Sequence, residues 1–292
     1  MLSIYLLIGL TRKVRALTLK EKIAKKERLI LDGGMGSQLI NYPEYSGKDP
    51  SLLNITHPEI IRAVHKSYVD AGSQLIIANT FDVNPKRYEN YAEIIAAAIE
   101  NAKVAGAPYV GLDIGPIGEL MYPMGQLKPE TAYEYFEAVV KEGVKCGADF
   151  IIIETIIDQN EMKEALSAAK NNSSLPVIVS CAYGKRGRLM TTGGKPEDVV
   201  AIAESLGADA VGANCSFGPD LMIPIIEAYK TLTDLPIWAK PNAGLPQVVD
   251  GKPVYTTGVE EFKEYMKQIE KIGATMIGGC CGTTPKYIEA IK

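Results

Sequence analysis

The sequence predicts a (β/α)8 barrel in residues 29–292, and two features of the chain support this fold. Eight short apolar or β-branched runs alternate with eight helical patterns, and polar, acidic or thiol side chains follow directly after most of the runs. Eight buried strands, each followed by a helix, are typical of this barrel. A doubly wound open sheet is the alternative. The glycine-rich segment 32–36 lacks the GxGxxG spacing and the Walker lysine that such a sheet usually carries.

The predicted elements follow one another in a regular order. The predicted strands span residues 29–31, 74–78, 109–112, 150–153, 177–180, 210–213, 237–239 and 275–277. The predicted helices span residues 58–71, 85–105, 129–146, 160–170, 196–206, 219–232, 259–272 and 285–291. Several helices begin with proline or end before glycine, and Thr56 with Glu59 three residues later resembles a capping box.

Residues 1–28 are predicted to form an N-terminal extension outside the barrel domain. The apolar stretch 2–10 is too short to span a bilayer, and basic residues follow it where a signal peptide would have its cleavage site. We therefore expect neither a membrane span nor a signal peptide. Residues 17–26 form a basic helical pattern, which we expect to close the bottom of the fold.

Composition narrows the classes of partner and compartment. The 292 residues are 47% hydrophobic, which is enough for a large core, and no low-complexity linker divides them. The net charge of -4 gives no general attraction to phosphate backbones, so a nucleic-acid partner is not expected. Five unevenly spaced cysteines do not resemble a secreted disulfide framework, and we expect a reducing, cytoplasmic compartment.

Residues that follow the strands of such a barrel face one mouth, where active sites lie. Here they are Asp32, Asn79, Thr80, Phe81, Asp113, Glu154, Thr155, Cys181, Asn214, Cys215, Asn242, Cys280 and Cys281. Polar, acidic and thiol groups from distant parts of the chain are therefore predicted to converge on one rim.

Three of these cysteines form a candidate zinc site. Cys215 follows the sixth run, and the adjacent Cys280 and Cys281 follow the eighth between glycines that allow an unusual turn. Thiolates suit Zn2+, and three protein ligands leave a fourth tetrahedral position open, as a catalytic site requires. Free buried thiols or a vicinal disulfide are the alternatives. Cys146 is expected to fill the core, and Cys181 to line the wall rather than bind metal.

Histidine chemistry has no place at this rim. The two histidines, His57 and His65, lie beside or on the first barrel helix, away from the ends of the strands. A histidine-rich metal centre and a serine-histidine nucleophile pair are therefore not expected.

A series of motifs spans the barrel. They are DGGMG at 32–36, ANTF at 78–81, DIGP at 113–116, ET at 154–155, GANC at 212–215, PNAG at 241–244 and GGCCGT at 278–283. In this order they resemble the zinc-dependent homocysteine S-methyltransferase family. They are most similar to the homocysteine-binding module of cobalamin-dependent methionine synthase.

The resemblance implies a site and a reaction. It implies that Cys215, Cys280 and Cys281 bind zinc and that the homocysteine thiol takes the open zinc position. The amino acid end of homocysteine would lie near Asp32, Gly33, Gly34, Thr80, Phe81 and Glu154, with Asn214 also expected among the substrate contacts. The carboxylates of Glu154 and Asp32 can accept hydrogen bonds from the substrate ammonium, and the backbone N–H groups of a glycine turn can hold the substrate carboxylate.

The methyl donor is the part of the reaction that the resemblance leaves open. Because the chain has a barrel and no folate or corrinoid domain, a methylcorrinoid would arrive on a separate protein rather than be bound by this chain alone. S-methylmethionine or S-adenosylmethionine as a free donor is the alternative. A different class, a non-catalytic zinc module or a dithiol redox module, is also compatible with the cysteines.

Overall fold

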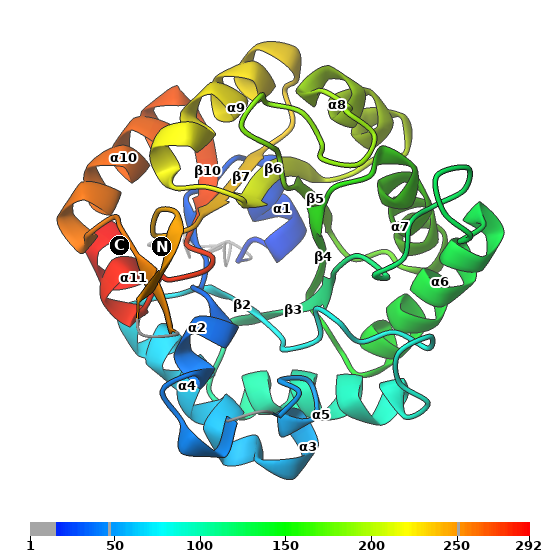
Figure 1. Ribbon diagram of the computed structural model, residues 1–292, viewed down its shortest axis with the longest axis horizontal. Coiled ribbons are helices and arrows are strands. Elements are labelled where there is room, and N and C mark those ends of the chain that lie inside the picture. The colour runs from blue at the N-terminus through cyan, green and yellow to red at the C-terminus, as the bar shows by residue number, and fades with distance from the viewer. Residues whose placement is uncertain (1–15, 46–47, 250–251) are drawn as a thin grey trace, which may run out of the picture.

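Eight parallel strands form a barrel wall in a computed structural model that describes residues 16–45, 48–249 and 252–292 (Figure 1). Their order around the wall is β1-β10-β7-β6-β5-β4-β3-β2. The strands are β1 (Leu29–Ile30), β2 (Leu75–Ile77), β3 (Tyr109–Ile114), β4 (Phe150–Ile156), β5 (Val177–Cys181), β6 (Ala210–Cys215), β7 (Ile237–Pro241) and β10 (Ala274–Ile277). The predicted (β/α)8 barrel is confirmed.

The barrel closes between β1 and β2 through few backbone contacts. A single parallel bridge joins Leu31 to Leu75. Beyond it, the Ile77 N–H donates to Asp32 Oδ2 at 2.8 Å, so a side chain takes the place of a strand partner. Asp32 is therefore part of the seam of the barrel as well as part of its mouth.

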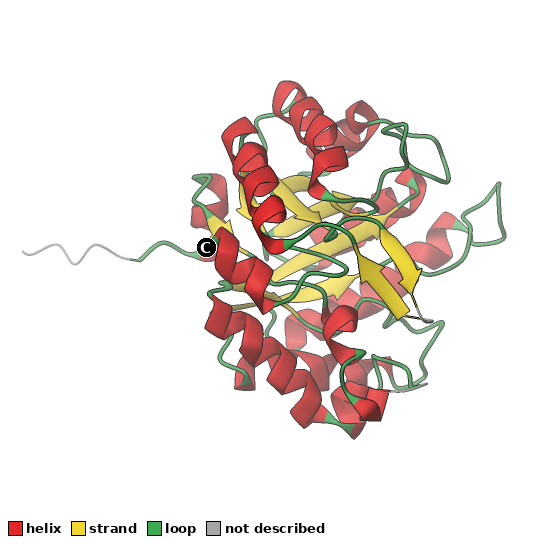
Figure 2. Cartoon of the chain, turned by 60° about the vertical axis from the view of Figure 1, so that its left-hand side comes forward, coloured by secondary structure: helices red, strands yellow, loops and turns green. Residues whose placement is uncertain are grey.

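Helices surround the strands on the outside (Figure 2). They are α1 (Leu19–Ala24), α2 (Met35–Leu39), α3 (Leu53–Thr56), α4 (Pro58–Ala71), α5 (Tyr91–Val104), α6 (Pro129–Lys145), α7 (Gln159–Asn172), α8 (Pro196–Ser205), α9 (Pro219–Leu232), α10 (Val259–Ile272) and α11 (Pro285–Ile291). The predicted limits of α4, α9, α10 and α11 are confirmed. Proline stands in the first turn of α4, α6, α8, α9 and α11, where its missing N–H costs no hydrogen bond.

Two predictions about helix starts are wrong. Helix α5 begins at Tyr91 rather than at residue 85, because the Asn84 side chain accepts the Arg87 N–H at 3.1 Å and holds this stretch in turns. The predicted capping box at Thr56 is absent. The Thr56 hydroxyl instead donates to the carbonyl of Leu52, the residue before α3, and His57 stands before α4 without a capping side-chain bond.

Short elements between the main strands and helices were not predicted. Helices α2 and α3 and a 3-10 turn (Pro43–Tyr45) lie between β1 and α4. An antiparallel hairpin, β8 (Pro246–Val249) and β9 (Lys252–Tyr255), follows β7. All of them stand in loops at the carboxyl ends of the strands, where an active site is expected.

Helix α1 packs into the amino-terminal end of the barrel and lies in the middle of the ring in Figure 1. Its Leu19 and Ile23 are buried in a cluster with inward-facing strand residues such as Phe150 and Trp238. Thr18 and Glu21 form a capping box at its start. The expectation that this leading helix closes the bottom of the fold is confirmed. Within the described ranges, no helix is long and apolar enough to cross a membrane.

Ile23→Ala is expected to lower the free energy of unfolding by about 2–5 kcal/mol, because it leaves a cavity under the barrel strands. Ile23 is only 1% exposed, whereas Lys25 on the same helical segment is exposed. Urea unfolding of both variants measures the effect, with Lys25→Ala within about 0.5 kcal/mol of the parent protein. Equal stabilities of the two variants would show that α1 does not contribute to the barrel core.

Candidate metal and substrate site

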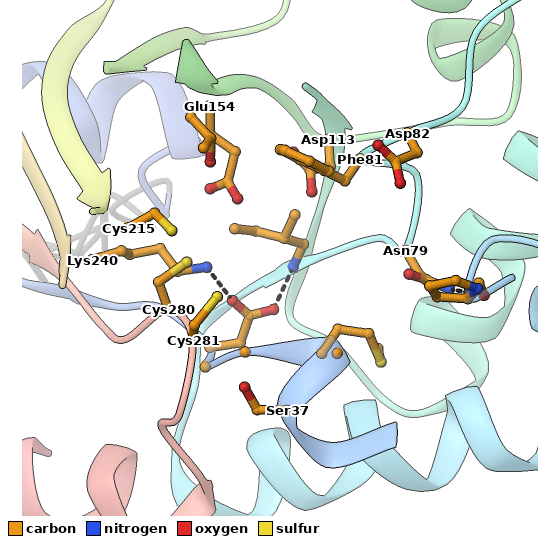
Figure 3. A pocket seen from close by; sticks show the side chains of 18 of the residues that line it. Ser37, Asn79, Phe81, Asp82, Asp113, Glu154, Cys215, Lys240, Cys280 and Cys281 are labelled. Atoms are coloured by element: carbon orange, nitrogen blue, oxygen red, sulfur yellow. Dashed lines mark hydrogen bonds and ion pairs between the residues drawn. The ribbon is translucent and has the colours of Figure 1, made fainter. Parts of the chain in front are cut away.

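A cavity of about 470 Å3 opens at the carboxyl ends of the strands (Figure 3). The charged and thiol side chains that line it lie in β3, β4, β6 and β7 and in the loops after β1, β2 and β10. They are Asp32, Asp82, Asp113, Glu154, Cys215, Lys240, Cys280 and Cys281. Phe81, Tyr45 and Tyr255 add aromatic walls. The convergence of distant strand ends that the sequence predicted is therefore observed.

The three predicted ligand thiols meet at one side of this cavity. The Sγ atoms of Cys215, Cys280 and Cys281 all lie within 4.8 Å of one another. A hydrogen bond to Cys215, followed by burial, raises the pKa of the Cys280 thiol well above its usual value. A cation among the three sulfur atoms would favour the thiolate forms. The donor set and its spacing thus fit a thiophilic divalent metal such as zinc.

Hydrogen bonds to the loop after β7 hold the two adjacent cysteines in place. The Cys280 N–H donates to the Pro241 carbonyl at 2.8 Å, and the Cys281 N–H donates to Asn242 Oδ1 at 3.0 Å. The Ala243 N–H in turn donates to the Cys281 carbonyl at 2.9 Å. These bonds bend the chain away from strand geometry, in which consecutive side chains would point to opposite faces.

Glycines allow the cysteine loop to turn and to be approached closely. Gly282 has φ +81°, which favours glycine. A Cβ at Gly34 would lie 2.7 Å from the Cys280 carbonyl oxygen, so only glycine allows the loop after β1 to pack here. Gly33 is confined in the same way, by Tyr68 and Thr283. The glycines of the DGGMG motif therefore bring the first loop against the cysteines.

Cys215 lies at a strained strand end that Asn214 stabilises. Cys215 has φ +56°, and Thr155, in the irregular last part of β4, has φ +59°. Asn214 Oδ1 accepts the Thr155 N–H at 2.9 Å and the Ser180 hydroxyl at 2.7 Å, while its Nδ2 donates to the Thr155 hydroxyl. Asn214 is 1% exposed and lies behind the cavity wall, so its contacts in the structure are with the protein.

Two of the residues predicted to follow β2, Phe81 and Thr80, have different positions relative to the cavity. Phe81 lines the cavity, and its carbonyl accepts the Gly115 N–H at 3.0 Å. Thr80 is fully buried, and its hydroxyl donates to the Asp113 carbonyl at 2.8 Å and accepts the Asp113 N–H at 3.0 Å. Thr80 thus fixes the backbone of Asp113 rather than lining the cavity.

Lys240 is a site residue that the sequence analysis missed. Its side chain is 4% exposed, and its Nζ lies 2.8 Å from Asp32 Oδ1. Burial lowers the pKa of Lys240, but the charges of Asp32 and Glu154 outweigh burial and raise it, so the ammonium stays charged. The alternation of a strand could have identified Lys240. Trp238 points into the barrel, and residues two apart on a strand share a face, so Lys240 points inward as well.

The remaining cysteines and the histidines stay outside the thiol cluster. Cys181 is fully buried with its sulfur 3.7 Å from Met162 Sδ, as a wall residue would be. Cys146 is half-buried at the end of α6 and packs against the core. His57 and His65 do not line the cavity, as expected.

Tyr255 on the β8–β9 hairpin covers the cysteine loop and was also not predicted. A Cβ at Gly282 would lie 2.2 Å from its ring, so the ring rests on the glycine. Burial, together with the neighbouring Cys281 thiol, raises the pKa of the Tyr255 phenol to about 12. The hairpin thus forms one wall of the cavity above the thiols.

Glu161, another residue missed by the sequence analysis, fixes the loop after β3. Its Oε1 accepts the Ile117 N–H at 2.7 Å, four residues beyond Asp113. Burial raises the pKa of Glu161 to about 7, partly offset by this hydrogen bond and assisted by the nearby charge of Asp158. The carboxyl therefore ionises later in the folded protein than in the unfolded chain.

Glu161→Gln is expected to change how stability depends on pH. Between pH 4.5 and 7 the unfolded chain loses the Glu161 proton first, so in the parent protein this group makes the free energy of unfolding fall as pH rises. The variant lacks this loss, and its stability relative to the parent should rise by about 3 kcal/mol across the interval. Urea unfolding at both pH values tests this, and a constant difference would contradict it.

Comparisons with known proteins agree with the geometry. Residues 29–292 match the sequence profile of homocysteine S-methyltransferase. The chain is 27% identical over 290 residues to methionine synthase of Mycobacterium leprae, covering 90% of this chain and 24% of that protein. The Mycobacterium tuberculosis methionine synthase gives the same identity and coverage over 292 residues. The chain thus spans about a quarter of the length of these relatives.

Solved structures share the fold. The metallated form of the Escherichia coli homocysteine methyltransferase MmuM matches with a TM-score of 0.74 and 23% identity, over 91% of this chain and 96% of that one. The carboxyl transferase domain of Rhizobium etli pyruvate carboxylase matches with a TM-score of 0.52 and 15% identity, over 89% of this chain and 42% of that one. At these identities the likeness describes the barrel alone. The family match over the whole barrel carries the assignment, and the chain belongs to the homocysteine S-methyltransferase family.

Proposed function

We propose that this chain transfers a methyl group to the thiol of homocysteine to form methionine, with a zinc ion held by Cys215, Cys280 and Cys281. The observation that carries the proposal is the position of the three thiols, which meet at the side of a cavity that also holds buried carboxylates. A substrate such as homocysteine would place its thiol at the three cysteines and its ammonium at the buried carboxylates.

The three cysteines would hold zinc and leave one tetrahedral position for the substrate sulfur. A zinc ion held there would supply Lewis acidity, which would favour the thiolate form of a substrate thiol that is otherwise about 3% ionised at pH 7. That gain is about 2 kcal/mol, and part of it is offset because a less basic sulfur is a weaker nucleophile. Most of the acceleration must therefore come from how the protein places the two reactants.

The chain's own residues supply this placement. Glu154, 7% exposed, lies in the cavity with Oε2 lacking a hydrogen-bond partner among the described residues, and we propose that it accepts the substrate ammonium. The turn at Gly33 and Gly34 also lines the cavity and is proposed to receive the substrate carboxylate. Phe81 and Tyr255 would exclude water from the reacting sulfur.

A methylcorrinoid carried by a separate protein is proposed as the donor. The loop between β3 and α6 exposes Leu120, Tyr122 and Met124 at the mouth of the barrel, with Tyr122 64% exposed. Exposed apolar groups beside a catalytic opening are typical of a protein contact surface. The acidic cavity lining favours a different donor class, a cationic sulfonium such as S-methylmethionine or S-adenosylmethionine, which we keep as the second candidate.

Methionine formation by the zinc-loaded protein tests the proposal. Homocysteine would be supplied with free methylcobalamin, S-methylmethionine, S-adenosylmethionine or betaine in parallel. Turnover with methylcobalamin alone would support a corrinoid protein as partner. Turnover with a sulfonium would replace that donor assignment, and turnover with none of the donors while homocysteine binds would limit the function to the thiol half of the site.

A further inference from the structure

The first and the last loop at the mouth of the barrel lie against each other. The glycine turn, Gly33 and Gly34, follows β1 and lines the cavity, and the cysteine loop, residues 278–284, follows β10. Strands β1 and β10 are paired, and beyond their last paired residues the Gly279 N–H donates to the Asp32 carbonyl at 3.1 Å. The region proposed to receive the substrate carboxylate therefore borders directly on the region proposed to hold zinc.

Hydroxyl groups bridge this border from both sides. Thr283 Oγ1, in the cysteine loop, accepts the Gly34 N–H at 3.3 Å and donates to the Cys280 carbonyl at 2.7 Å. Ser37 Oγ, just after the glycine turn, accepts the Gly282 N–H at 2.7 Å, and Figure 3 shows this side chain on the side of the cavity where the thiols lie. Each loop thus supplies a side chain that bonds to the backbone of the other loop.

Tyr68 on α4 joins the two loops from behind the cavity wall. Its hydroxyl oxygen lies 3.2 Å from the Gly34 carbonyl oxygen and 3.0 Å from the Thr283 carbonyl oxygen. A phenol has one proton to donate, so the two loops share it in a three-centre bond. Tyr68 is 1% exposed and Thr283 is fully buried, and neither lines the cavity. These two residues therefore reach the ligands only through the backbone of the loops.

We propose that Tyr68 and Thr283 are positioning residues that couple the two halves of the site, so that zinc at the thiols and an amino acid at the glycine turn each strengthen the binding of the other. The inference rests on the proposed function, which assigns these two ligands. Zinc held by the thiols would fix the cysteine loop, and the hydroxyl bridges would carry this restraint to Gly34. A turn that is fixed beforehand loses less conformational freedom on binding, which raises affinity.

A ligand without sulfur isolates the coupling that passes through the protein. Homocysteine itself would link the two regions by its own chain, because its thiol takes a zinc position. L-2-Aminobutanoate has the ammonium, the carboxylate and the carbon chain of homocysteine and lacks only the thiol. Zinc then affects its binding through the hydroxyl bridges or through space, and Tyr68→Phe separates these routes because it removes a hydrogen-bond donor without changing any charge.

The test measures equilibrium binding of L-2-aminobutanoate to the parent protein and to Tyr68→Phe, each with and without zinc and with the thiols kept reduced. In the parent protein, zinc should tighten binding by at least about fivefold, the lower end of ordinary coupling between sites. In Tyr68→Phe the factor should fall below about twofold, because the two loops lose their shared donor. Coupling is reciprocal, so the amino acid should tighten zinc binding by the same factor in competition with a chelator.

Tyr229→Phe is the matched control. Tyr229 is also fully buried, and its hydroxyl donates to a backbone carbonyl, that of Gly212 at 3.1 Å. It lies on α9 and does not line the cavity, so this variant should keep the coupling of the parent protein. The proposal is overturned if Tyr68→Phe keeps the parent's coupling factor, or if zinc leaves the affinity of the parent protein for L-2-aminobutanoate unchanged.

Two substitutions of Thr283 test the bridge with homocysteine itself and do not depend on the affinity of the analogue. Thr283→Val keeps the shape of the side chain and removes the hydroxyl that accepts the Gly34 N–H, whereas Thr283→Ser keeps the hydroxyl. With one equivalent of zinc bound, Thr283→Val should bind homocysteine about tenfold more weakly than the parent protein, and Thr283→Ser within about threefold of it. Equal losses in both variants would assign the effect to packing and overturn the proposal. A parent protein that binds no zinc or no homocysteine would instead reject the proposed function, so the two failures are distinguishable.

Discussion

Cys215→Ala is expected to abolish stoichiometric zinc binding, although Cys280 and Cys281 remain in place. Cys215 supplies one of the three sulfur atoms that lie within 4.8 Å of one another, from a strand far from the other two in sequence. Loss of a residue that merely supports a metal ligand weakens binding 10–100-fold, so loss of a ligand should weaken it by more than about 100-fold. Methionine formation should fall with the zinc content.

Zinc content after dialysis, and affinity from competition with a chelator, measure this effect. Cys146→Ser is the matched control, because Cys146 is half-buried at the end of α6 and outside the cluster. It should keep one equivalent of zinc. If Cys215→Ala retained full zinc, the adjacent cysteines would be a site of another kind. A vicinal dithiol redox pair, for example, has no need of a distant third cysteine.

The cysteine cluster could be predicted from the sequence because its geometry is largely set by topology. Strand ends of a parallel barrel meet at one mouth, which brings Cys215 and the Cys280-Cys281 pair to the same end of the barrel, and the loop after β7 then holds the pair in place. The same reasoning placed Asp32 and Glu154 in the cavity. Strand periodicity and glycine positions are therefore sufficient to predict which residues meet at the mouth of the barrel.

The roles of single polar side chains could not be predicted in the same way. Thr80 and Asn214 stand at the predicted rim. In the structure, however, the Thr80 hydroxyl bonds to the backbone of Asp113, and the Asn214 amide bonds to Thr155 in β4. A sequence does not show whether a polar side chain will form hydrogen bonds with the protein backbone or with a substrate. Lys240 was missed because the predicted strand stopped at residue 239, whereas β7 continues to Pro241.

The hairpin β8–β9 was missed for a different reason. Its strands are four residues each, and proline and glycine interrupt the alternation that marks a strand. Its pairing depends on contacts made elsewhere, such as Tyr255 resting on Gly282. Tertiary contacts of this kind decide the walls of the cavity, while local sequence decides the barrel beneath them.

Glu154→Gln is expected to raise the KM for homocysteine by at least about 30-fold, because truncating one partner of a buried charge pair costs about 2–5 kcal/mol. Zinc content should stay at one equivalent, since Glu154 is not among the clustered thiols. Steady-state kinetics with the active donor, alongside metal analysis, separates the two effects. Glu164→Gln, a half-buried change on α7 outside the cavity, is the control. An unchanged KM in Glu154→Gln would remove this carboxylate from the substrate site, whereas loss of zinc would show that it supports the metal cluster instead.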